Sequence, residues 1–311
     1  MNQNTSDTPH HMDESQAKLS GIPAALGAYL IWGFLPLYLI LVKSVPPFEF
    51  VGWRIIWTLP LCLLIVAFRK QGKEVLAALR DPRSLAILCA SSALIATNWL
   101  VYIWAIQIDH VYAASLGYYI NPLFNILAGT VLLGERLNRT QWLAVAIAAV
   151  GVAILAAGAL TTLWVSLTLA ISFGTYGLLR KQVAVGSLPG LTIESAILLL
   201  PAAGITFYYS QTAAGSSFGG HIGLSLAIVL GGVVTAVPLL MFAVAARRMD
   251  YSTLGFFQYL APSIVFLLGL FVFKEELKPA QLACFALIWI AIALFLKDLW
   301  QRRSRSRSAQ I

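Results

Sequence analysis

Charged side chains are scarce in this sequence of 311 residues. Asp, Glu, Lys and Arg together make up 11% of the chain, whereas hydrophobic residues make up 59%. Soluble domains usually carry about 25% charged residues, so a soluble fold of this length would expose more apolar surface than its interior can hide. In a bilayer apolar side chains can face lipid, so this difficulty does not arise. The mean hydropathy of +0.81 also agrees with a membrane location. The composition therefore predicts an integral membrane protein.

Cysteines and nucleotide- or metal-binding motifs are equally scarce. Cys62, Cys89 and Cys284 each lie within an apolar run, and their odd number and wide spacing suit neither a disulfide framework nor a zinc site. The sequence shows no P-loop, GxGxxG, HExxH or CxxC pattern. We therefore expect no metal and no cofactor, and ATP-driven pumping would need a separate subunit.

Long apolar runs make up most of the chain. A helix needs roughly 20 apolar residues to cross the hydrocarbon core of a bilayer. The segments that reach this length are 21–41, 48–68, 84–105, 111–133, 141–158, 161–179, 190–209, 223–245, 252–273 and 279–297. The connection 210–220 is rich in Gly, Ser and Thr, which predicts a flexible exposed loop. The predicted fold class is an all-α membrane protein with ten transmembrane helices.

The basic residues are distributed unevenly between the two sides of these segments. With the N-terminus placed inside, every Lys and Arg falls on the inner side except Arg54, Lys43, Lys274 and Lys278. Cytoplasmic loops carry such an excess, so both termini are predicted to lie in the cytoplasm, with the chain in a bacterial inner membrane. We expect the basic tail at 298–311 to meet anionic lipid headgroups and to bind no nucleic acid.

An internal repeat relates the two halves of the chain. A shift of 140 residues, without any gap, aligns Ala105 with Ala245, Tyr119 with Tyr259, Pro122 with Pro262, and Glu135 with Glu275. The first half holds an odd number of helices, so the second half enters the membrane from the opposite side. We predict two inverted five-helix repeats at 21–158 and 161–297, with a cytoplasmic tail at 1–20. Such repeats can rock around a central site and expose it alternately to the two sides.

Helix-breaking residues occur at matching places in the two halves. Pro122 and Pro262 each lack an amide donor and free a carbonyl group one turn back. Gly117 and Gly255 add further breaks nearby. These four residues are candidate hinges, because interrupted helices at corresponding positions often mark a transporter's binding site. The alternative is that the prolines only kink their helices.

Several stretches carry a specific pattern of glycine, proline and aromatic residues. They are GAYLIWGFLPLY (27–38), VPPFE (45–49), NWLVYIWA (98–105), ASLGYYINPLFNILAG (114–129), LGERL (133–137), YGLLRK (176–181), VPLL (237–240) and STLGFFQYLAPS (252–263). Over nearly the whole chain, this pattern resembles the RarD-like proteins of the EamA family, in the drug/metabolite transporter superfamily. The resemblance implies ten helices in two inverted repeats and a carrier or exporter of small metabolites or drugs. The family often places His before the Arg of its second helix, where this chain has Trp53 before Arg54.

Two charged residues in the predicted spans are candidate site residues. Arg54 lies about six residues into 48–68, roughly 9 Å from the end of the helix. It is a candidate anchor for an anionic group of a substrate, or else it snorkels to the headgroups, and Glu49 is a possible ion-pair partner. Glu194, at the start of 190–209, is a candidate proton-coupling carboxylate, or else it stabilises a helix N-terminus.

Polar and aromatic side chains within the spans complete the candidate substrate path. Asparagines in membrane helices commonly bind a neighbouring helix, and aromatic side chains commonly pack, but together they also suit a cavity for amphipathic molecules. The candidates are Trp32, Asn98, Trp99, Tyr102, Tyr118, Tyr119, Asn121, Tyr176, Gln258 and Tyr259.

These features predict a secondary transporter that moves a small metabolite or drug-like molecule by alternating access. An intramembrane enzyme would need converging His, Asp, Glu or Ser groups at bilayer depth, and no histidine lies inside a predicted span. A regulatory or scaffold membrane protein without transport is the alternative. The expected partners are the small-molecule substrate and the bilayer, with proton coupling as a candidate energy source.

Overall fold

The computed structural model of the chain describes residues 21–108, 110–274, 276 and 278–308, with the backbone alone from residue 302 onward. Over this range the regular secondary structure is entirely helical. The α-helices are α2 (Ile22–Leu39), α3 (Pro47–Phe68), α4 (Gly72–Arg80), α5 (Pro82–Gln107), α6 (Val111–Leu132), α7 (Arg139–Ala157), α8 (Leu163–Gln182), α9 (Ser187–Ser210), α10 (Ile222–Arg248), α11 (Tyr251–Gln258), α12 (Leu260–Phe271) and α13 (Pro279–Ser308). Two short 3₁₀ helices, η1 (Ile40–Val42) and η2 (Leu160–Thr162), extend α2 and precede α8. The predicted tail at 1–20 and Glu275 of the predicted repeat lie outside the described residues.

Nine stretches of the described residues are long and apolar enough to cross a membrane. They are α2, α3, α5, α7, α8, α9, α10, α13 and the pair α11–α12. The remaining predicted segment, 111–133, is helix α6, whose 22 residues have the required length. Asn121, Asn125, Tyr118 and Tyr119 lower its hydropathy, however, so α6 is not among the nine. Length and composition therefore support nine spans where the apolar runs predict ten.

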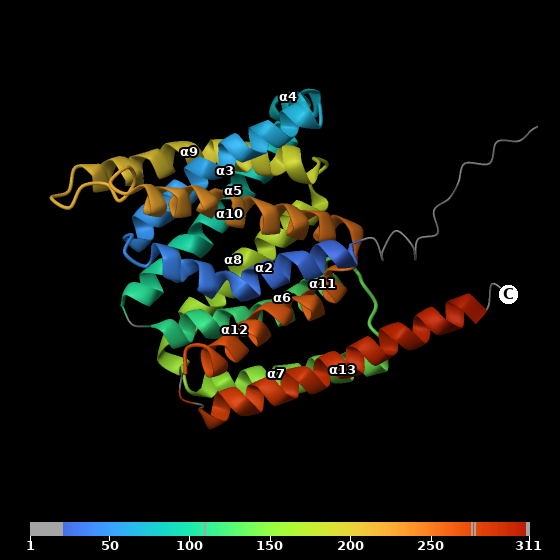
Figure 1. Cartoon of the computed structure of the whole chain (residues 1–311). Helices are drawn as coiled ribbons and strands as arrows, with labels where there is room; N and C mark the ends of the chain where they lie inside the picture. The colour runs from blue at the N-terminus through green and yellow to red at the C-terminus, as the bar shows by residue number, and fades with distance from the viewer. Residues whose placement is uncertain (1–20, 109, 275, 277, 309–311) are drawn as a thin grey trace, which may run out of the picture.

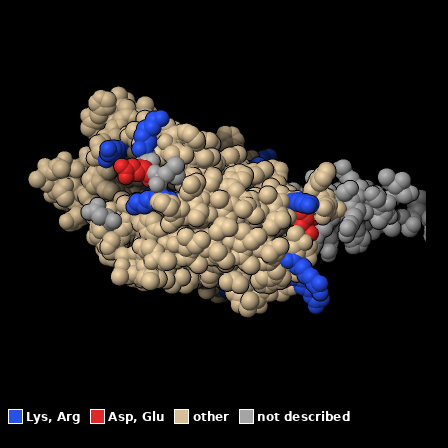
Figure 2. All heavy atoms as spheres, turned by 90° about the horizontal axis from the view of Figure 1, so that it is seen from below, with Lys and Arg blue, Asp and Glu red and all other residues tan. Residues whose placement is uncertain are grey.

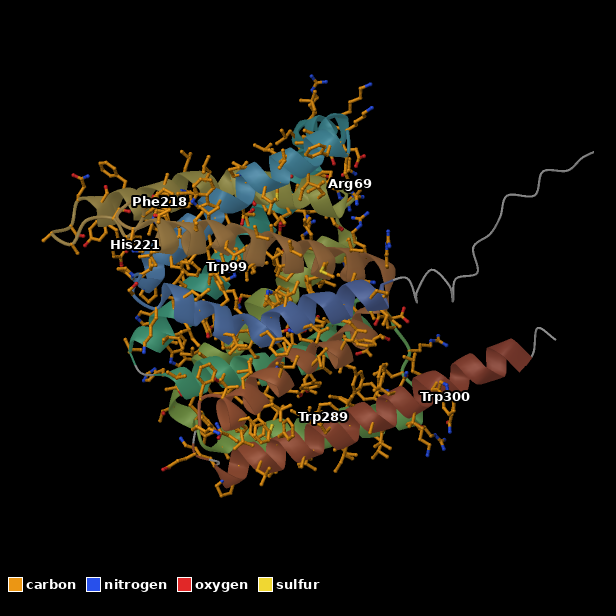
Figure 3. All side chains as sticks on the ribbon, viewed as in Figure 1. Arg69, Trp99, Phe218, His221, Trp289 and Trp300 are labelled. Carbon is orange, nitrogen blue, oxygen red and sulfur yellow. The ribbon has the colours of Figure 1, made fainter. Side chains whose placement is uncertain are left out.

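The long helices lie side by side and alternate in direction (Figure 1). We call the end with the α2–α3, α5–α6, α7–α8, α9–α10 and α12–α13 connections the Lys43 end, and the opposite end the Arg69 end. Helices α7 and α13 pack together along one edge of the bundle. Figure 3 shows Phe218 and His221 at the Lys43 end, Arg69 at the other, and Trp99 between them.

The surface has the distribution of charge that lipid requires. Charged side chains gather toward the two ends of the face seen in Figure 2, and the band between them is almost free of charge. Large apolar side chains such as Leu200, Phe68 and Val131 are exposed on the helices. Exposed apolar surface of this extent is stable when it faces hydrocarbon.

Helix α4 is an element that the apolar runs do not predict. It is a short helix with Glu74 in its first turn and Arg80 in its last. Its Ala78 packs with Val183 and Ile193 in a small cluster at the Arg69 end. Only the five apolar residues 75–79 separate Glu74 from Arg80, which is too short a run to cross a bilayer, and the helix lies at the end of the bundle (Figure 1).

The central pair of helices is α6 and α11, and the two differ at the candidate hinges. The helix α6 continues without interruption through Gly117 and Pro122, whereas the α-helical hydrogen bonding is interrupted at Tyr259, between α11 and α12 and before Pro262. A Cβ atom on Gly255 would lie 2.8 Å from the carbonyl oxygen of Pro122. In this conformation, Gly255 therefore allows α11 to approach α6 closely.

Candidate functional site

A cavity of about 590 Å³ lies between the helices. Trp32 on α2, Trp99 on α5 and Gln258 on α11 line it near the middle of the bundle, and Lys43 and Glu276 line it at the Lys43 end. The cavity therefore runs from the centre of the bundle to the Lys43 end. Its volume is within the roughly 300–1,000 Å³ that is usual for small-molecule sites.

Arg54 is the charged residue that lines the middle of this cavity. Its Cζ atom lies 4.5 Å from the ring centroid of Trp99, and the guanidinium also interacts electrostatically with Tyr118, Tyr38 and Tyr102. Among the described residues, no carboxylate lies within ion-pair distance of Arg54, and its buried Nε–H has no hydrogen-bond partner. The side chain thus points into the bundle, not toward the headgroup region, and leaves a positive charge without a counter-charge.

Aromatic side chains form much of the remaining cavity wall. Tyr102 and Tyr118 meet edge to face with 5.6 Å between their ring centroids, and Trp32 packs in the same way against Phe173. Tyr119 also lines the cavity, as does the candidate hinge Pro262. A wall of this kind buries flat apolar groups and offers hydroxyl groups for hydrogen bonds.

Three of the predicted path residues are used elsewhere. Asn98 donates hydrogen bonds to the carbonyl of Leu169 (2.9 Å) and to the hydroxyl of Ser172 (3.1 Å), which joins α5 to α8. Asn121 donates to the carbonyl of Ala170 on α8 (3.1 Å). Tyr259 is fully buried and packs in the cluster between α6, α7 and α13. None of the three lines the cavity, and neither does a fourth predicted path residue, Tyr176, which donates a hydrogen bond to Glu194.

A chain of side-chain amides forms one border of the cavity. Asn125 donates to Gln258 (2.6 Å), and Gln258 in turn donates to Asn121 (2.8 Å). Only Gln258 of these three reaches the cavity wall. Both ends of its amide are bonded to α6, so Gln258 is held in one orientation where α6 and α11 cross.

Glu194 is buried two turns inside α9, because the helix begins at Ser187 and not near residue 190. The effect of a helix dipole fades within the first turn, so stabilisation of the helix N-terminus does not explain this residue. Its carboxylate lies 3.6 Å from Arg180 Nη1 on α8, and the hydroxyl groups of Ser91 and Tyr176 donate hydrogen bonds to it. Glu194 therefore belongs to a buried ionic cluster that joins α5, α8 and α9.

Arg180 is the residue that the distribution of charge misplaces. It counts as a loop charge in the orientation argument, yet its side chain is 0% exposed. A Cβ atom on Gly190 would overlap the Arg180 guanidinium, so glycine at this position leaves room for the guanidinium beside α9 in the orientation that it has here. The sequence could have indicated this burial, because Arg180 lies four residues after Tyr176 and residues four apart share a helix face.

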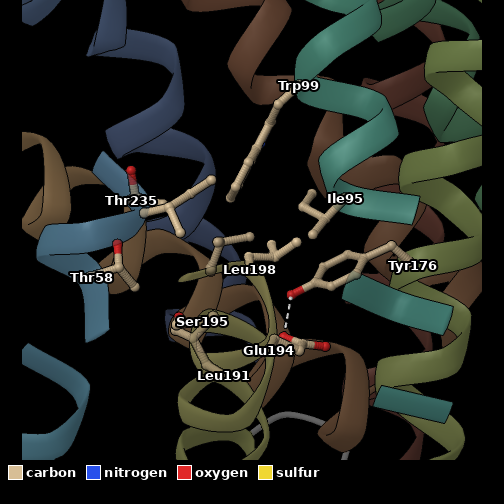
Figure 4. Close-up of a pocket in the computed structure, with 11 residues that line it drawn as sticks. Thr58, Ile95, Trp99, Tyr176, Leu191, Glu194, Ser195, Leu198 and Thr235 are labelled. Carbon is tan, nitrogen blue, oxygen red and sulfur yellow. Dashed lines mark hydrogen bonds between the residues drawn. The ribbon is translucent and has the colours of Figure 1, made fainter. Parts of the chain in front are cut away.

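A second, much smaller cavity of about 10 Å³ lies between Trp99 and Glu194, and we call it the chamber. Trp99, Thr235 and Leu239 line both the chamber and the large cavity. Figure 4 shows the indole of Trp99 on one side of the chamber and Glu194, bonded to Tyr176, on the other. The two cavities thus share a wall, and Trp99 is part of it.

Glu49 does not pair with Arg54. Its carboxylate accepts hydrogen bonds from Trp53 Nε1 (3.1 Å), from Ser216 Oγ (2.9 Å), and from the backbone N–H and hydroxyl of Ser217 (2.8 and 2.7 Å). The ring of Phe218 packs on Trp53 with 4.5 Å between centroids. The 210–220 connection, predicted to be flexible and exposed, is therefore bound to the start of α3.

The Arg69 end is closed by hydrogen bonds between its connections. Glu135, in the α6–α7 connection, accepts hydrogen bonds from the first two residues of α11. Lys181 donates to the carbonyls of Ala246 and Met249, and Arg247 donates to those of Val183 and Val185. Tyr29, Trp32, Phe173, Tyr176 and Phe242 pack together between this end and the cavity.

Comparison with known proteins gives consistent results. A sequence model of the EamA-like transporter family matches residues 19–157. An uncharacterized transporter of Pseudomonas aeruginosa is 41% identical over 287 residues, which is 92% of this chain and 96% of that protein. The protein RarD of Escherichia coli is 39% identical over 305 residues, covering 95% of this chain and 100% of the relative.

A solved protein crystal structure superposes with a TM-score of 0.70 at 22% sequence identity. The match covers 89% of this chain and 97% of that one. At this level of identity it shows a shared fold.

Proposed function

Because the chain belongs to the EamA-like transporter family, we propose that it is a secondary transporter that carries a small amphipathic anion through the cavity around Arg54. The observation that carries this proposal is the unpaired guanidinium inside a cavity of about 590 Å³. A buried charge is costly unless a partner compensates it, and among the described residues no carboxylate does so. An anionic group of the substrate supplies the missing partner.

The shape of the wall specifies the remainder of the substrate. Trp99, Tyr102 and Tyr118 present ring faces and edges next to Arg54, and Gln258 presents a fixed amide. Arginine stacks on aromatic rings and binds carboxylates and other oxyanions with paired donors. We therefore expect a molecule with one flat apolar body and one carboxylate, sulfonate or phosphate group.

Alternating access by two inverted repeats is the proposed mechanism. If α2, α3, α5, α6 and α7 correspond to α8, α9, α10, α11–α12 and α13, the packing partners exchange consistently. Helix α6 packs on α8 as α12 packs on α2, and α5 packs on α8 as α10 packs on α2. Helices α3 and α7 pack directly on their own counterparts, α9 and α13. This exchange supports a second state, in which the Arg69 end opens and the Lys43 end closes.

We place this carrier in a bacterial inner membrane with both termini, and hence the Arg69 end, in the cytoplasm. The excess of Lys and Arg in the connections of that end supports this orientation. The present conformation is then open to the outside. Ten helices cross the membrane in this proposal, with α6 held by its polar bonds to α8 and α11.

The test is uptake into proteoliposomes of a panel built on one ring system. Naphthalene-1-sulfonate is the anionic probe, and it is compared with neutral and cationic derivatives of naphthalene. The wild type is expected to show saturable uptake of the anion, and Arg54→Ala is expected to lose it at unchanged expression and thermal stability. Arg54→Lys, which keeps the charge and loses the paired donors, should fall between them.

The controls separate transport from other roles. Phe207→Ala, at an exposed position on α9, removes a lipid-facing aromatic residue of similar bulk and should keep wild-type flux. If the wild type shows no saturable uptake of any member of the panel, the substrate class is wrong. If cysteines placed at the two ends also never alternate in accessibility, a non-transporting scaffold explains the protein better.

A further inference from the structure

The chamber between Trp99 and Glu194 is just large enough for one water molecule, and a few polar residues interrupt its largely apolar lining. A cavity needs about 10–15 Å³ of probe volume and two to four polar partners to hold one water molecule. The chamber offers about 10 Å³, and the polar residues of its lining include Glu194, Tyr176 and Ser195. A single water there would lie between the carboxylate and the wall shared with the large cavity.

The ion pair beside the chamber is poorly compensated. Arg180 and Glu194 are 0% and 2% exposed, yet the distance between them is 3.6 Å, and neither Nε nor Nη1 of Arg180 makes a hydrogen bond. A buried pair offsets the cost of its desolvation only when its geometry is good and its remaining donors are satisfied. Ser91 and Tyr176 donate hydrogen bonds to Glu194, so the unsatisfied donors of this pair are those of Arg180.

The groups that face this pair come from four helices. Tyr176 and Arg180 contact Glu194 from α8, Ser91 from α5, and Cys62 on α3 interacts with it electrostatically. From α10, Arg247 interacts electrostatically with Arg180. At neutral pH none of the facing tyrosine or cysteine side chains carries a charge. Glu194 is thus the group of this cluster that can take up a proton.

Resting on the transport function proposed above, we propose that Glu194 is the proton-binding group of the carrier and is reached from the substrate cavity through the water-sized chamber beneath Trp99. One proton passes from the cavity water to the chamber water and on to a carboxylate oxygen of Glu194. The carboxylate becomes a neutral carboxylic acid, and Arg180 loses its counter-charge.

Protonation of Glu194 affects the Arg69 end, which is opposite to the end from which the proton enters. Arg180 also donates a hydrogen bond to the carbonyl of Ser187 (2.9 Å) at the start of α9, so the same guanidinium links the cluster to the α8–α9 connection. Neutralising Glu194 leaves a buried cation without a partner, which favours rearrangement of that connection and access of water to it. A proton taken up from one side thereby promotes opening on the other, as coupled transport requires.

The first experiment compares exchange with gradient-driven accumulation in proteoliposomes, using naphthalene-1-sulfonate, whose charge does not change with pH. Glu194→Gln is expected to retain exchange of labelled for unlabelled probe at equal pH, but to lose the accumulation that a pH gradient drives in the wild type. Glu49→Gln is the matched control, because Glu49 is an equally buried carboxylate that lines neither cavity. It should retain both activities.

The second experiment does not need transport. Infrared difference spectra between neutral and acidic pH should show the carbonyl stretch of a buried carboxylic acid in the wild type, shifted in D₂O. The double variant Arg180→Gln/Glu194→Gln, which avoids an unpaired buried charge, should lack this band. The band in the double variant, or wild-type accumulation in Glu194→Gln, would overturn the assignment. A wild type that transports no member of the panel but shows the band refutes only the transport proposal.

Discussion

Glu135 and Ser252 are joined by two hydrogen bonds at the Arg69 end, from the N–H (2.8 Å) and the hydroxyl (2.6 Å) of Ser252 to Glu135 Oε2. The N–H of Tyr251 donates to the other carboxylate oxygen (2.6 Å). One carboxylate therefore binds the N-terminus of α11, where the helix dipole also favours negative charge. The α6–α7 connection of the first half is in this way attached to the second half.

Replacing Glu135 with Ala should weaken closure of the Arg69 end. Hydrogen bonds to a charged group are worth about 1.5–3 kcal/mol each, so their loss is large compared with the few kcal/mol that separate conformers. Spin labels at the exposed positions Arg136 and Arg248 should then show an added population at longer distance. Ser252→Ala removes one bond and keeps two, so its shift should be smaller. An unchanged distance distribution in Glu135→Ala would contradict this role.

Trp99→Leu should weaken binding of the anion without abolishing it. The indole supports the Arg54 guanidinium through a cation–π contact, worth roughly 0.5–2 kcal/mol. The half-saturating concentration of naphthalene-1-sulfonate should rise by roughly 2- to 30-fold. Trp99→Phe, which keeps an aromatic face, should lie closer to the wild type. Equal half-saturation in Trp99→Leu and the wild type would show that the contact does not orient Arg54.

Gly255→Ala should destabilise the protein by driving α11 away from α6. The added methyl group would meet the Pro122 carbonyl at 2.8 Å and the Ile126 side chain at 3.0 Å. Overpacking of this kind costs typically 1–3 kcal/mol, which should appear as a lower melting temperature in detergent. Gly204→Ala is the matched control, since nothing lies within 4 Å of the corresponding Cβ on α9. It should be neutral or slightly stabilising, because Ala favours helix over Gly.

Asp81 should make stability depend on pH at the start of α5. Hydrogen bonds from Ser84, followed by one from the Arg83 amide, lower the pKa of this N-cap carboxyl in the folded protein. A lowered folded-state pKa stabilises the fold above the unfolded-state pKa, and this contribution is lost as pH falls through the folded-state value. Asp81→Asn keeps the cap but not the charge. Its melting temperature should therefore be below that of the wild type at neutral pH and should converge with it in acid.

Most of the helices could be predicted because they are long, largely apolar runs with clear ends. The run 111–133 became Val111–Leu132, and 223–245 became Ile222–Arg248. Helix α4 was missed because it is short and amphipathic, so it resembles a polar connection. Its position depends on a cluster with α8 and α9 residues that a local pattern does not contain.

The candidate site was harder to predict because its contacts join distant helices. Arg54 was recognised as a candidate from its depth in the helix alone, and that depth is also compatible with snorkelling. Its contact with Trp99 depends on the packing of α5, which a local pattern does not contain. Glu49 does not pair with Arg54, and Ser216 and Ser217, in a distant loop, supply its donors. The prediction for Glu194 placed the helix start too late, and the burial of Arg180 depends on a glycine of the next helix.

Helix α6 has a particular consequence for how this multi-pass membrane protein is made. Its amide side chains bond to Ala170 and Gln258, on helices that the ribosome adds later. Polar side chains facing hydrocarbon weaken insertion of a single helix. We therefore expect α6 to insert weakly on its own and to be stabilised when α8 and then α11 are added. The long helix of lowest hydropathy in the first half thus makes these hydrogen bonds only when the second half is present.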